Sequence, residues 1–177
     1  MPVNAYCSAL YRSLTTLSKF AEDFLLERLP SMKPKANQLL GALEADCMQR
    51  LEGELETVDV KLKHVICEAG SDLDHAYFPQ GAVLSLLTLM EDGTAIETAN
   101  IGREGAFGIF AAMYSRVSFN RCLVQLEGPM VRCPIAAIER EFARSANVRN
   151  LFVSYSETLL SQVQQTGVTP IPQTVTC

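Results

Sequence analysis

The strongest indication of the fold comes from residues 82–108, AVLSLLTLMEDGTAIETANIGREGAFG. Ala82–Met90 is an apolar run of the length of a buried strand, and Ile96–Ile101 is a second one. Between them lies Glu91–Thr94, where Gly93 follows an aspartate and can adopt the positive φ of a tight hairpin turn. The leucine-rich first run alone would also fit a helix, so it is the turn that favours strands. We therefore predict an antiparallel hairpin followed by a glycine-rich loop.

Toward the C-terminus the pattern continues with short elements. Gly102–Tyr114 has glycines at steps of three and then apolar residues, which predicts a tight loop leading into a short helix. Cys122–Leu126 and Pro129–Cys133 are predicted strands. Ile135–Arg144 is a predicted helix, and a longer helix, capped by Asn147, is expected to run to about Thr166.

In the N-terminal half, the hydrophobic pattern changes from helical spacing to the alternation typical of strands. Asn37–Glu54 has apolar residues at helical spacing, whereas Val58–Glu68 alternates apolar and polar residues as a half-buried strand does. Asp74–Phe78 is a further short extended piece. Short strands with turns every 8–12 residues are typical of an antiparallel sandwich, barrel or jelly roll. We predict a mainly β domain with flanking helices.

The two ends of the chain differ from this module. Residues 1–31 predict one amphipathic helix, with a stripe formed by Cys7, Leu10, Leu14, Leu17, Ala21 and Phe24. This helix is either a docking or oligomerising element or a non-native extension upstream of Met32. Residues 36–146 form the expected β-roll with its flanking helices, 147–166 the long helix, and 167–177 an irregular tail without periodicity.

Composition limits the classes of function. The chain has 177 residues, of which 48% are hydrophobic, and a net charge of −5. It lacks the basic footprint of a self-sufficient nucleic-acid binder. No run approaches the roughly 20 apolar residues of a membrane-spanning helix, so we expect a cytoplasmic protein with no membrane association.

Metal and redox chemistry have few residues to use. The six cysteines show no CxxC spacing, which argues against a zinc knuckle, a redox dithiol or an iron–sulfur cluster. Cys67, Cys122 and Cys133 lie in segments with the pattern of strands and are expected to be small core residues. His64 and His75 are too few for a cupin-like metal site. We expect no enzyme activity, no metal and no cofactor.

Several motifs, in this order and spacing, suggest a known family. They are Cys67–Gly70, Asp74–Pro79, Gly81, Glu91–Gly93, Glu97, Ile101–Gly108 and Glu141–Ser145. Together they resemble the sensor half of Crp/Fnr-type bacterial transcription regulators, over roughly Ala36 to Thr166. The resemblance implies a cyclic-nucleotide-binding-like jelly roll, a double-stranded β-helix flanked by helices. It also implies that the last long helix forms a dimer interface and leads to a helix-turn-helix domain.

The ligand motifs depart from the family pattern. Members that bind cyclic AMP have a Gly-Glu-Leu segment and an Arg-(Ser/Thr)-Ala segment, whose carboxylate and arginine hold the ribose and the cyclic phosphate. The matching pieces here are Gly108-Ile109-Phe110 and Asn120-Arg121-Cys122. Arg121 shares a strand face with Leu123 and is expected to point away from the pocket. We predict weak or absent cyclic-nucleotide binding, and Ile109 indicates a less polar guest. The ligand-pocket candidates are Gly105, Ala106, Gly108, Ile109, Phe110, Asn120 and Arg121.

The long helix carries an apolar stripe, Val148, Phe152, Tyr155 and Leu159. The stripe either packs on the β-roll or forms the dimer seam that the resemblance implies. We favour the seam and hence a homodimer, because Leu151, Leu160 and Val163 are available for the side facing the roll.

The tail at 167–177 is too short for a recognition helix, so we expect that DNA is bound only through a C-terminal domain missing from this chain, a truncated form. The leading hypothesis is the effector-sensing and dimerising domain of a Crp/Fnr-like regulator, unable to bind DNA alone. The alternatives are a truncated relative that pairs with a full-length regulator and blocks it, a non-functional remnant, and, less favoured, a cupin-like metalloenzyme.

Overall fold

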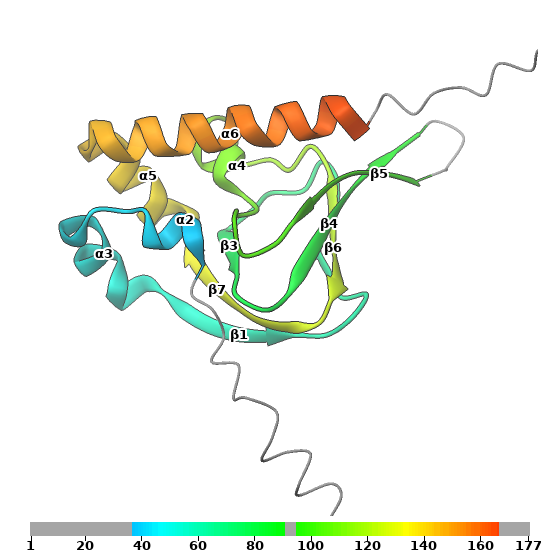
Figure 1. Ribbon diagram of the computed structural model, residues 1–177, viewed down its shortest axis with the longest axis horizontal. Helices are drawn as coiled ribbons and strands as arrows, with labels where there is room; N and C mark the ends of the chain where they lie inside the picture. The colour runs from blue at the N-terminus through cyan, green and yellow to red at the C-terminus, as the bar shows by residue number, and fades with distance from the viewer. Residues whose placement is uncertain (1–36, 91–94, 167–177) are drawn as a thin grey trace, which may run out of the picture. The chain divides into compact units, whose positions relative to one another are not determined.

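The computed structural model describes residues 37–90 and 95–166 (Figure 1). The predicted N-terminal helix at 1–31, the hairpin turn at Glu91–Thr94 and the tail at 167–177 lie outside the described residues.

Strands form two antiparallel sheets, with helices beside them. The strands are β1 Glu56–Val60, β2 Val65–Cys67, β3 His75–Pro79, β4 Val83–Leu89, β5 Ala95–Ile101, β6 Arg121–Leu126 and β7 Gly128–Pro134. One sheet has the order β1-β7-β3 and the other the order β2-β6-β4-β5. The helices are α2 Gln38–Gly41, α3 Ala45–Leu51 with the 3₁₀ turn η1 Glu52–Glu54, α4 Ile109–Met113, α5 Ile135–Arg144 and α6 Ala146–Thr166. The prediction of a mainly β domain with flanking helices is confirmed.

The predicted single strand at Val58–Glu68 is wrong. β1 ends at Val60 and pairs with β7, whereas β2 begins at Val65 and pairs with β6 in the other sheet. The turn between them contains Lys63 with φ of 65°, and the Lys63 N–H donates to the Val124 carbonyl at 2.8 Å. Alternation of apolar and polar residues cannot reveal this break, because both strands present one face to the core and keep the same period.

The hairpin β4–β5 supplies much of the buried inner face of its sheet. Leu84 pairs with Ile101 on β5 and with Val124 on β6, and all three side chains are at most 1% exposed. Leu86 pairs with Ala99 before a register shift in the hairpin. Alternation then places the intervening residues on the opposite face of the sheet. Leu84, Leu86, Ala99 and Ile101 thus line the interior, whereas Leu89, Met90 and Ile96 near the tip of the hairpin are about half exposed.

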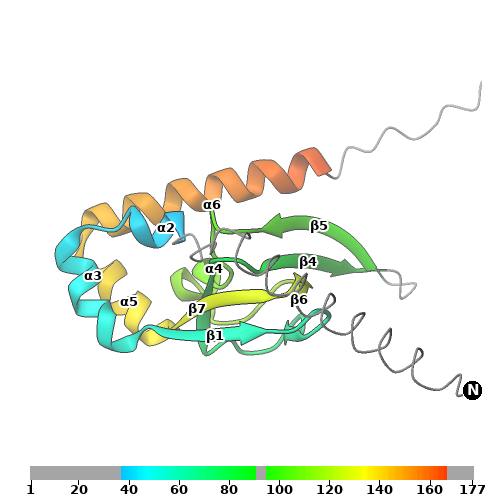
Figure 2. The same ribbon diagram turned by 60° about the horizontal axis from the view of Figure 1, so that its bottom comes forward.

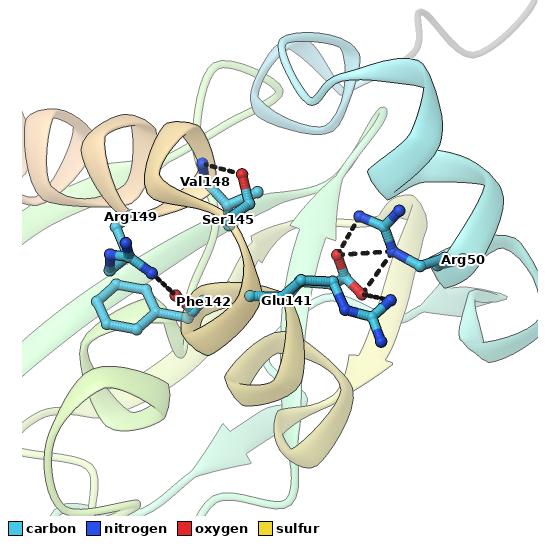
Figure 3. A network of polar contacts seen from close by, with 7 residues as sticks. Arg50, Glu141, Phe142, Ser145, Val148 and Arg149 are labelled. Carbon is cyan, nitrogen blue, oxygen red and sulfur yellow. Dashed lines mark hydrogen bonds and ion pairs between the residues drawn. The ribbon is translucent and has the colours of Figure 1, made fainter.

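The helix α6 begins at Ala146, and its cap lies two residues before the predicted one. Its cap is Ser145, whose Oγ accepts a hydrogen bond from the Val148 N–H at 3.3 Å, as Figure 3 shows. Arg149 also links α6 to α5, because its Nη1 donates to the Phe142 carbonyl near the end of α5 at 2.9 Å. The predicted cap, Asn147, is exposed, and its Nδ2 instead donates to the Glu44 carboxylate before α3.

The stripe assigned to a dimer seam faces the interior of the same chain. α6 runs alongside α5, α4 and β5 (Figures 1 and 2). Val148 and Phe152 are each 1% exposed and belong to the core, and Tyr155 and Leu159 are partly buried against it. These residues therefore pack on the β-roll, which is the alternative to the dimer seam. The exposed apolar residues of the helix are Val153 and Leu160, 44% and 53% exposed.

A buried carboxylate joins α3 to α5. Glu141 is 5% exposed, and Arg50 approaches it in a two-pronged arrangement, with Nε 3.0 Å from Oε1 and Nη2 2.7 Å from Oε2 (Figure 3). A second guanidinium, that of Arg144, lies 3.9 Å from Oε1. The hydrogen bonds from Arg50 hold the pKa of Glu141 below its usual value, because they favour the ionised carboxylate.

This pair makes stability depend on pH in a defined direction. Its contribution is fully present above the pKa of an unfolded glutamate, near 4.5, and is lost as the pH falls through the lower folded-state pKa. The Glu141→Gln variant is expected to melt at a lower temperature at pH 7 and to lose less on moving from pH 7 to pH 3 than the unmodified protein. Thermal unfolding followed by circular dichroism measures both. Glu157→Gln, on the exposed face of α6, is the control. Equal pH dependence for both variants would contradict the assignment.

Candidate ligand-binding site

The glycine loop, residues 102–108, is held from four sides. On the first side Asn37, 2% exposed, donates from Nδ2 to the Pro79 carbonyl at 2.9 Å and to the Gly105 carbonyl at 2.8 Å. Its Oδ1 also accepts from the Leu40 N–H at 3.0 Å and so caps α2. One amide thus ties α2, the end of β3 and the glycine loop together. Sequence reasoning missed this role, although asparagine at a helix start was a usable signal for the cap.

The second contact comes from α6. The hydroxyl of Tyr155 accepts from the Ala106 N–H at 3.0 Å and donates to the Ala106 carbonyl at 2.9 Å. Burial raises the pKa of this phenol, so it remains a neutral donor and acceptor. A Cβ on Gly105 would lie 2.5 Å from the same hydroxyl, so only glycine allows this approach. Tyr155 therefore acts within the chain, between α6 and the glycine loop.

The third and fourth contacts order the two ends of the loop. Phe107 and Tyr77 of β3 exchange backbone hydrogen bonds at 2.8 and 2.9 Å, and their rings stack at 6.3 Å between centroids. At the other end, the Glu104 carboxylate accepts from the Gly102 N–H at 2.7 Å. Glu104 itself is exposed.

Gly108 connects the loop to α4 through a conformation that favours glycine. Its φ is 98°, and a Cβ there would lie 2.8 Å from Cδ2 of Leu73 and 3.1 Å from the His75 carbonyl. The turn directs α4 along the side of the β-roll, which leaves Ile109 1% exposed.

Beside this loop lies a cavity of about 370 Å³. Its wall is built from the glycine loop and α4, from β4, β5 and the segment before β6, and from the second half of α6. Most of the wall is apolar: Leu73, Leu86, Ile101, Ala106, Phe107, Gly108, Ile109, Phe110, Ala111, Val117, Phe119, Leu159, Leu160 and Val163. The polar wall residues are Ser118 and Asn120, and no charged side chain is among those that line the cavity.

Five of the seven sequence-predicted pocket residues line this cavity: Ala106, Gly108, Ile109, Phe110 and Asn120. Gly105 is buried in the loop behind it, against Tyr155. Arg121 is not in the wall. Its Nε lies 3.2 Å from Oε2 of Glu68, as expected for the strand face opposite Asn120.

Sequence reasoning missed the contribution of α6 to the cavity. Leu159 was assigned to a dimer seam, and Leu160 and Val163 only to general packing, yet all three line the cavity. Helical spacing shows which residues share a face, and it does not show which part of the fold that face meets.

Asn120 has a fixed side chain at the cavity wall. Its Nδ2 donates to Oγ1 of Thr88 at 3.0 Å. The hydroxyl of Ser118, a residue 5% exposed, donates to the Asn120 backbone carbonyl at 2.7 Å. These bonds set the orientation of the polar end of a mostly apolar space.

Residues considered for metal or redox chemistry lie apart from this cavity. His64 is exposed, and His75 is half-buried in β3 beside Tyr77. Within residues 37–90 and 95–166, no group of three or more metal-binding side chains comes together. The predicted core cysteines are buried, and burial raises the pKa of Cys133 to about 12, so that this thiol stays protonated.

Among the described residues, no helix has the length and apolar character needed to cross a membrane.

Comparisons with known proteins add to this geometry. No family model and no curated protein matches the chain. Among solved structures, a putative transcriptional regulator of the crp/fnr family from Eubacterium rectale is similar, with a TM-score of 0.63 and 18% identity over 72% of this chain and 60% of that one. The sensor domain of the transcriptional regulator DNR from Pseudomonas aeruginosa matches with a TM-score of 0.58 and 13% identity, over 76% and 89% of the two chains.

A eukaryotic protein has the same architecture. The regulatory subunit of a cAMP-independent protein kinase A from Trypanosoma brucei matches with a TM-score of 0.62 and 11% identity, over 75% of this chain. The chain spans about half of the length of that subunit, 48%. Identities this low establish the architecture and not the activity. The described part of the chain therefore has the cyclic-nucleotide-binding-like jelly-roll fold, the fold found in sensor domains of Crp/Fnr-type regulators and in kinase regulatory subunits.

Proposed function

We propose that this domain is the effector-sensing module of a Crp/Fnr-like transcription regulator and that its effector is not a cyclic nucleotide. The observation that carries the proposal is the cavity beside the glycine loop, where Ile109 stands at the carboxylate position of the family motif and Asn120 at the arginine position. The module acts by binding, without catalysis, and a cytoplasmic location belongs to the same proposal.

Backbone donors of the glycine loop support the exclusion of a cyclic phosphate. The N–H groups of Gly105, Ala106 and Phe107 already donate, to the Gly102 carbonyl, the Tyr155 hydroxyl and the Tyr77 carbonyl respectively. A phosphate bound to these three groups would have to displace their hydrogen bonds, and it would find no cationic side chain in the cavity wall. An anion buried without a partner is strongly disfavoured.

Assembly and DNA binding are further parts of the proposal. The exposed face of α6 offers a surface for a homodimer in place of the buried stripe. DNA recognition is assigned to a separate domain of the regulator, because the chain carries a net charge of −5. Pairing with a full-length regulator through the same helix face remains the second candidate, and mixed dimers in a pull-down with such a regulator would favour it.

Isothermal calorimetry with cyclic AMP and cyclic GMP tests the exclusion of nucleotides. We expect no heat of binding with 100 μM ligand, roughly a tenfold excess over the protein. At these concentrations a micromolar dissociation constant would give a measurable heat. Arg121→Ala is expected to change nothing, since Arg121 pairs with Glu68 outside the cavity. Micromolar affinity for cyclic AMP that disappears in Arg121→Ala would overturn the proposal.

A further inference from the structure

We infer that the cavity beside the glycine loop takes an uncharged, mainly apolar small molecule that carries one hydroxyl or a similar hydrogen-bonding group directed at Asn120. This inference rests on the proposed function, since it names the ligand class of the same site. Its evidence is the composition of the wall, the free hydrogen-bonding capacity of Asn120, and the place of Leu160 at the cavity.

The composition of the wall determines the charge of the ligand. Apolar side chains or glycine make up all of the lining except Ser118 and Asn120. Moving an ionised group from water into such a space costs far more than moving a hydrocarbon, unless a counter-charge meets it. The cations closest in sequence, Arg116 and Arg121, pair with Glu139 and Glu68 and are not lining residues. A neutral molecule is therefore selected over its ionised analogue.

The polar end of the cavity determines the functional group. An asparagine side chain offers two N–H donors and an acceptor oxygen, and the bond to Thr88 uses one donor. Within the described residues, Oδ1 of Asn120 accepts no hydrogen bond and is not a buried, unsatisfied atom, so it is open to a ligand. Ser118 donates its hydroxyl proton to the Asn120 carbonyl and is also hydrogen-bonded to Cys67, so the remaining donor and acceptor are those of Asn120. A hydroxyl, which donates and accepts, matches both remaining functions.

The size of the cavity sets the scale of the molecule. About 370 Å³ lies at the lower end of the 300–1,000 Å³ typical of small-molecule sites. It suits a molecule of two or three rings or a medium-length hydrocarbon chain. A large lipid with several chains would not fit inside this volume.

The chain offers a matched pair of residues for locating the site. Leu160 and Val153 are both exposed apolar residues of α6, at 53% and 44% exposure. Leu160 lines the cavity and Val153 does not. A lysine at either position can reach water and should leave the fold intact. A lysine at position 160 places an ammonium group at the edge of the cavity, which disfavours an apolar guest, whereas one at position 153 does not.

The first measurement uses two fluorescent probes with the same ring skeleton. N-Phenyl-1-naphthylamine is neutral and has one N–H donor, and 8-anilino-1-naphthalenesulfonate adds a sulfonate. We expect the neutral probe to bind one site per chain and at least about tenfold more tightly than the sulfonate, because the wall cannot compensate the charge. Decan-1-ol should displace the neutral probe, and decanoate should displace it at least about tenfold less well.

The second measurement uses the variants. Leu160→Lys is expected to weaken the neutral probe about tenfold or more, with Val153→Lys unchanged within about twofold. Asn120→Leu should weaken displacement by decan-1-ol about fivefold, since a lost hydrogen bond is worth about 1 kcal/mol. Gln125→Leu, at an exposed position of β6 outside the cavity, should leave it unchanged.

Several outcomes would overturn the inference. One is equal affinity for the neutral and the sulfonated probe, and another is equal weakening by Leu160→Lys and Val153→Lys, which would indicate a general apolar surface on α6. A third is loss of probe binding as gel filtration shows dimer forming, which would mean that a second copy covers the cavity. No binding of either probe would refute the ligand class and leave the exclusion of nucleotides standing. Displacement of the neutral probe by micromolar cyclic AMP would refute both proposals.

Discussion

Phe152→Ala is expected to lower the free energy of unfolding by about 3–5 kcal/mol. Phe152 lies on α6, is 1% exposed, and belongs to the core that α6 shares with the β-roll. Removing a buried ring loses its transfer free energy and leaves a cavity that the surrounding side chains fill only in part. Urea titration followed by circular dichroism measures the change, which should appear as a lower midpoint with little change in slope.

The adjacent residue provides the control. Val153 is 44% exposed, so Val153→Ala should change stability by no more than about 0.5 kcal/mol. The pair also separates the two interpretations of the helix stripe. A core residue lowers stability equally at all protein concentrations, whereas a residue of a dimer interface lowers it in a concentration-dependent way. A Phe152→Ala protein that is as stable as the unmodified monomer, and only fails to dimerise, would restore the seam interpretation.

Asn37→Leu is the second large effect, an expected loss of at least about 3 kcal/mol. The change removes the cap of α2, worth about 1 kcal/mol. It also leaves the carbonyls of Pro79 and Gly105 without the donor that satisfies them, at about 1–3 kcal/mol for each buried group that stays unpaired. Urea titration gives the loss, and hydrogen exchange should show faster opening of the glycine loop than of β6.

A nearly isosteric variant separates the two roles of Asn37. Asn37→Asp keeps the acceptor that caps α2 but replaces the amide donor with an oxygen facing two carbonyls. It should therefore destabilise almost as much as Asn37→Leu. Asn150→Leu, at an exposed position of α6, should change stability by less than about 0.5 kcal/mol. Near-normal stability of Asn37→Asp would show that the cap alone matters.

Local patterns were enough to predict much of the fold and part of the site. The Asp-Gly turn between two apolar runs predicted the pairing of β4 with β5, and the short helix after the glycine loop is α4. Alternation along residues 120–124 predicted that Arg121 and Asn120 would lie on opposite faces, and their positions at Glu68 and at the cavity agree. These predictions worked because each depends on neighbours in the chain, through the twofold period of strands and the freedom of glycine.

Other features depend on contacts between distant segments. The four anchors of the glycine loop come from α2, β3, α6 and the loop itself, and the contact between Asn37 and Gly105 spans 68 residues. The break between β1 and β2 arises because the two strands belong to different sheets.

The sequence alone gives three features: the β-roll with flanking helices, the uncharged residues Ile109 and Asn120 at positions where a nucleotide site needs charge, and the amphipathic nature of α6. The tertiary structure determines the direction in which α6 faces, with Val148 and Phe152 in the core and Leu159, Leu160 and Val163 at the cavity. The physical reason is that periodicity defines a face of a helix by its own residues, whereas burial of that face requires a partner surface from elsewhere in the chain.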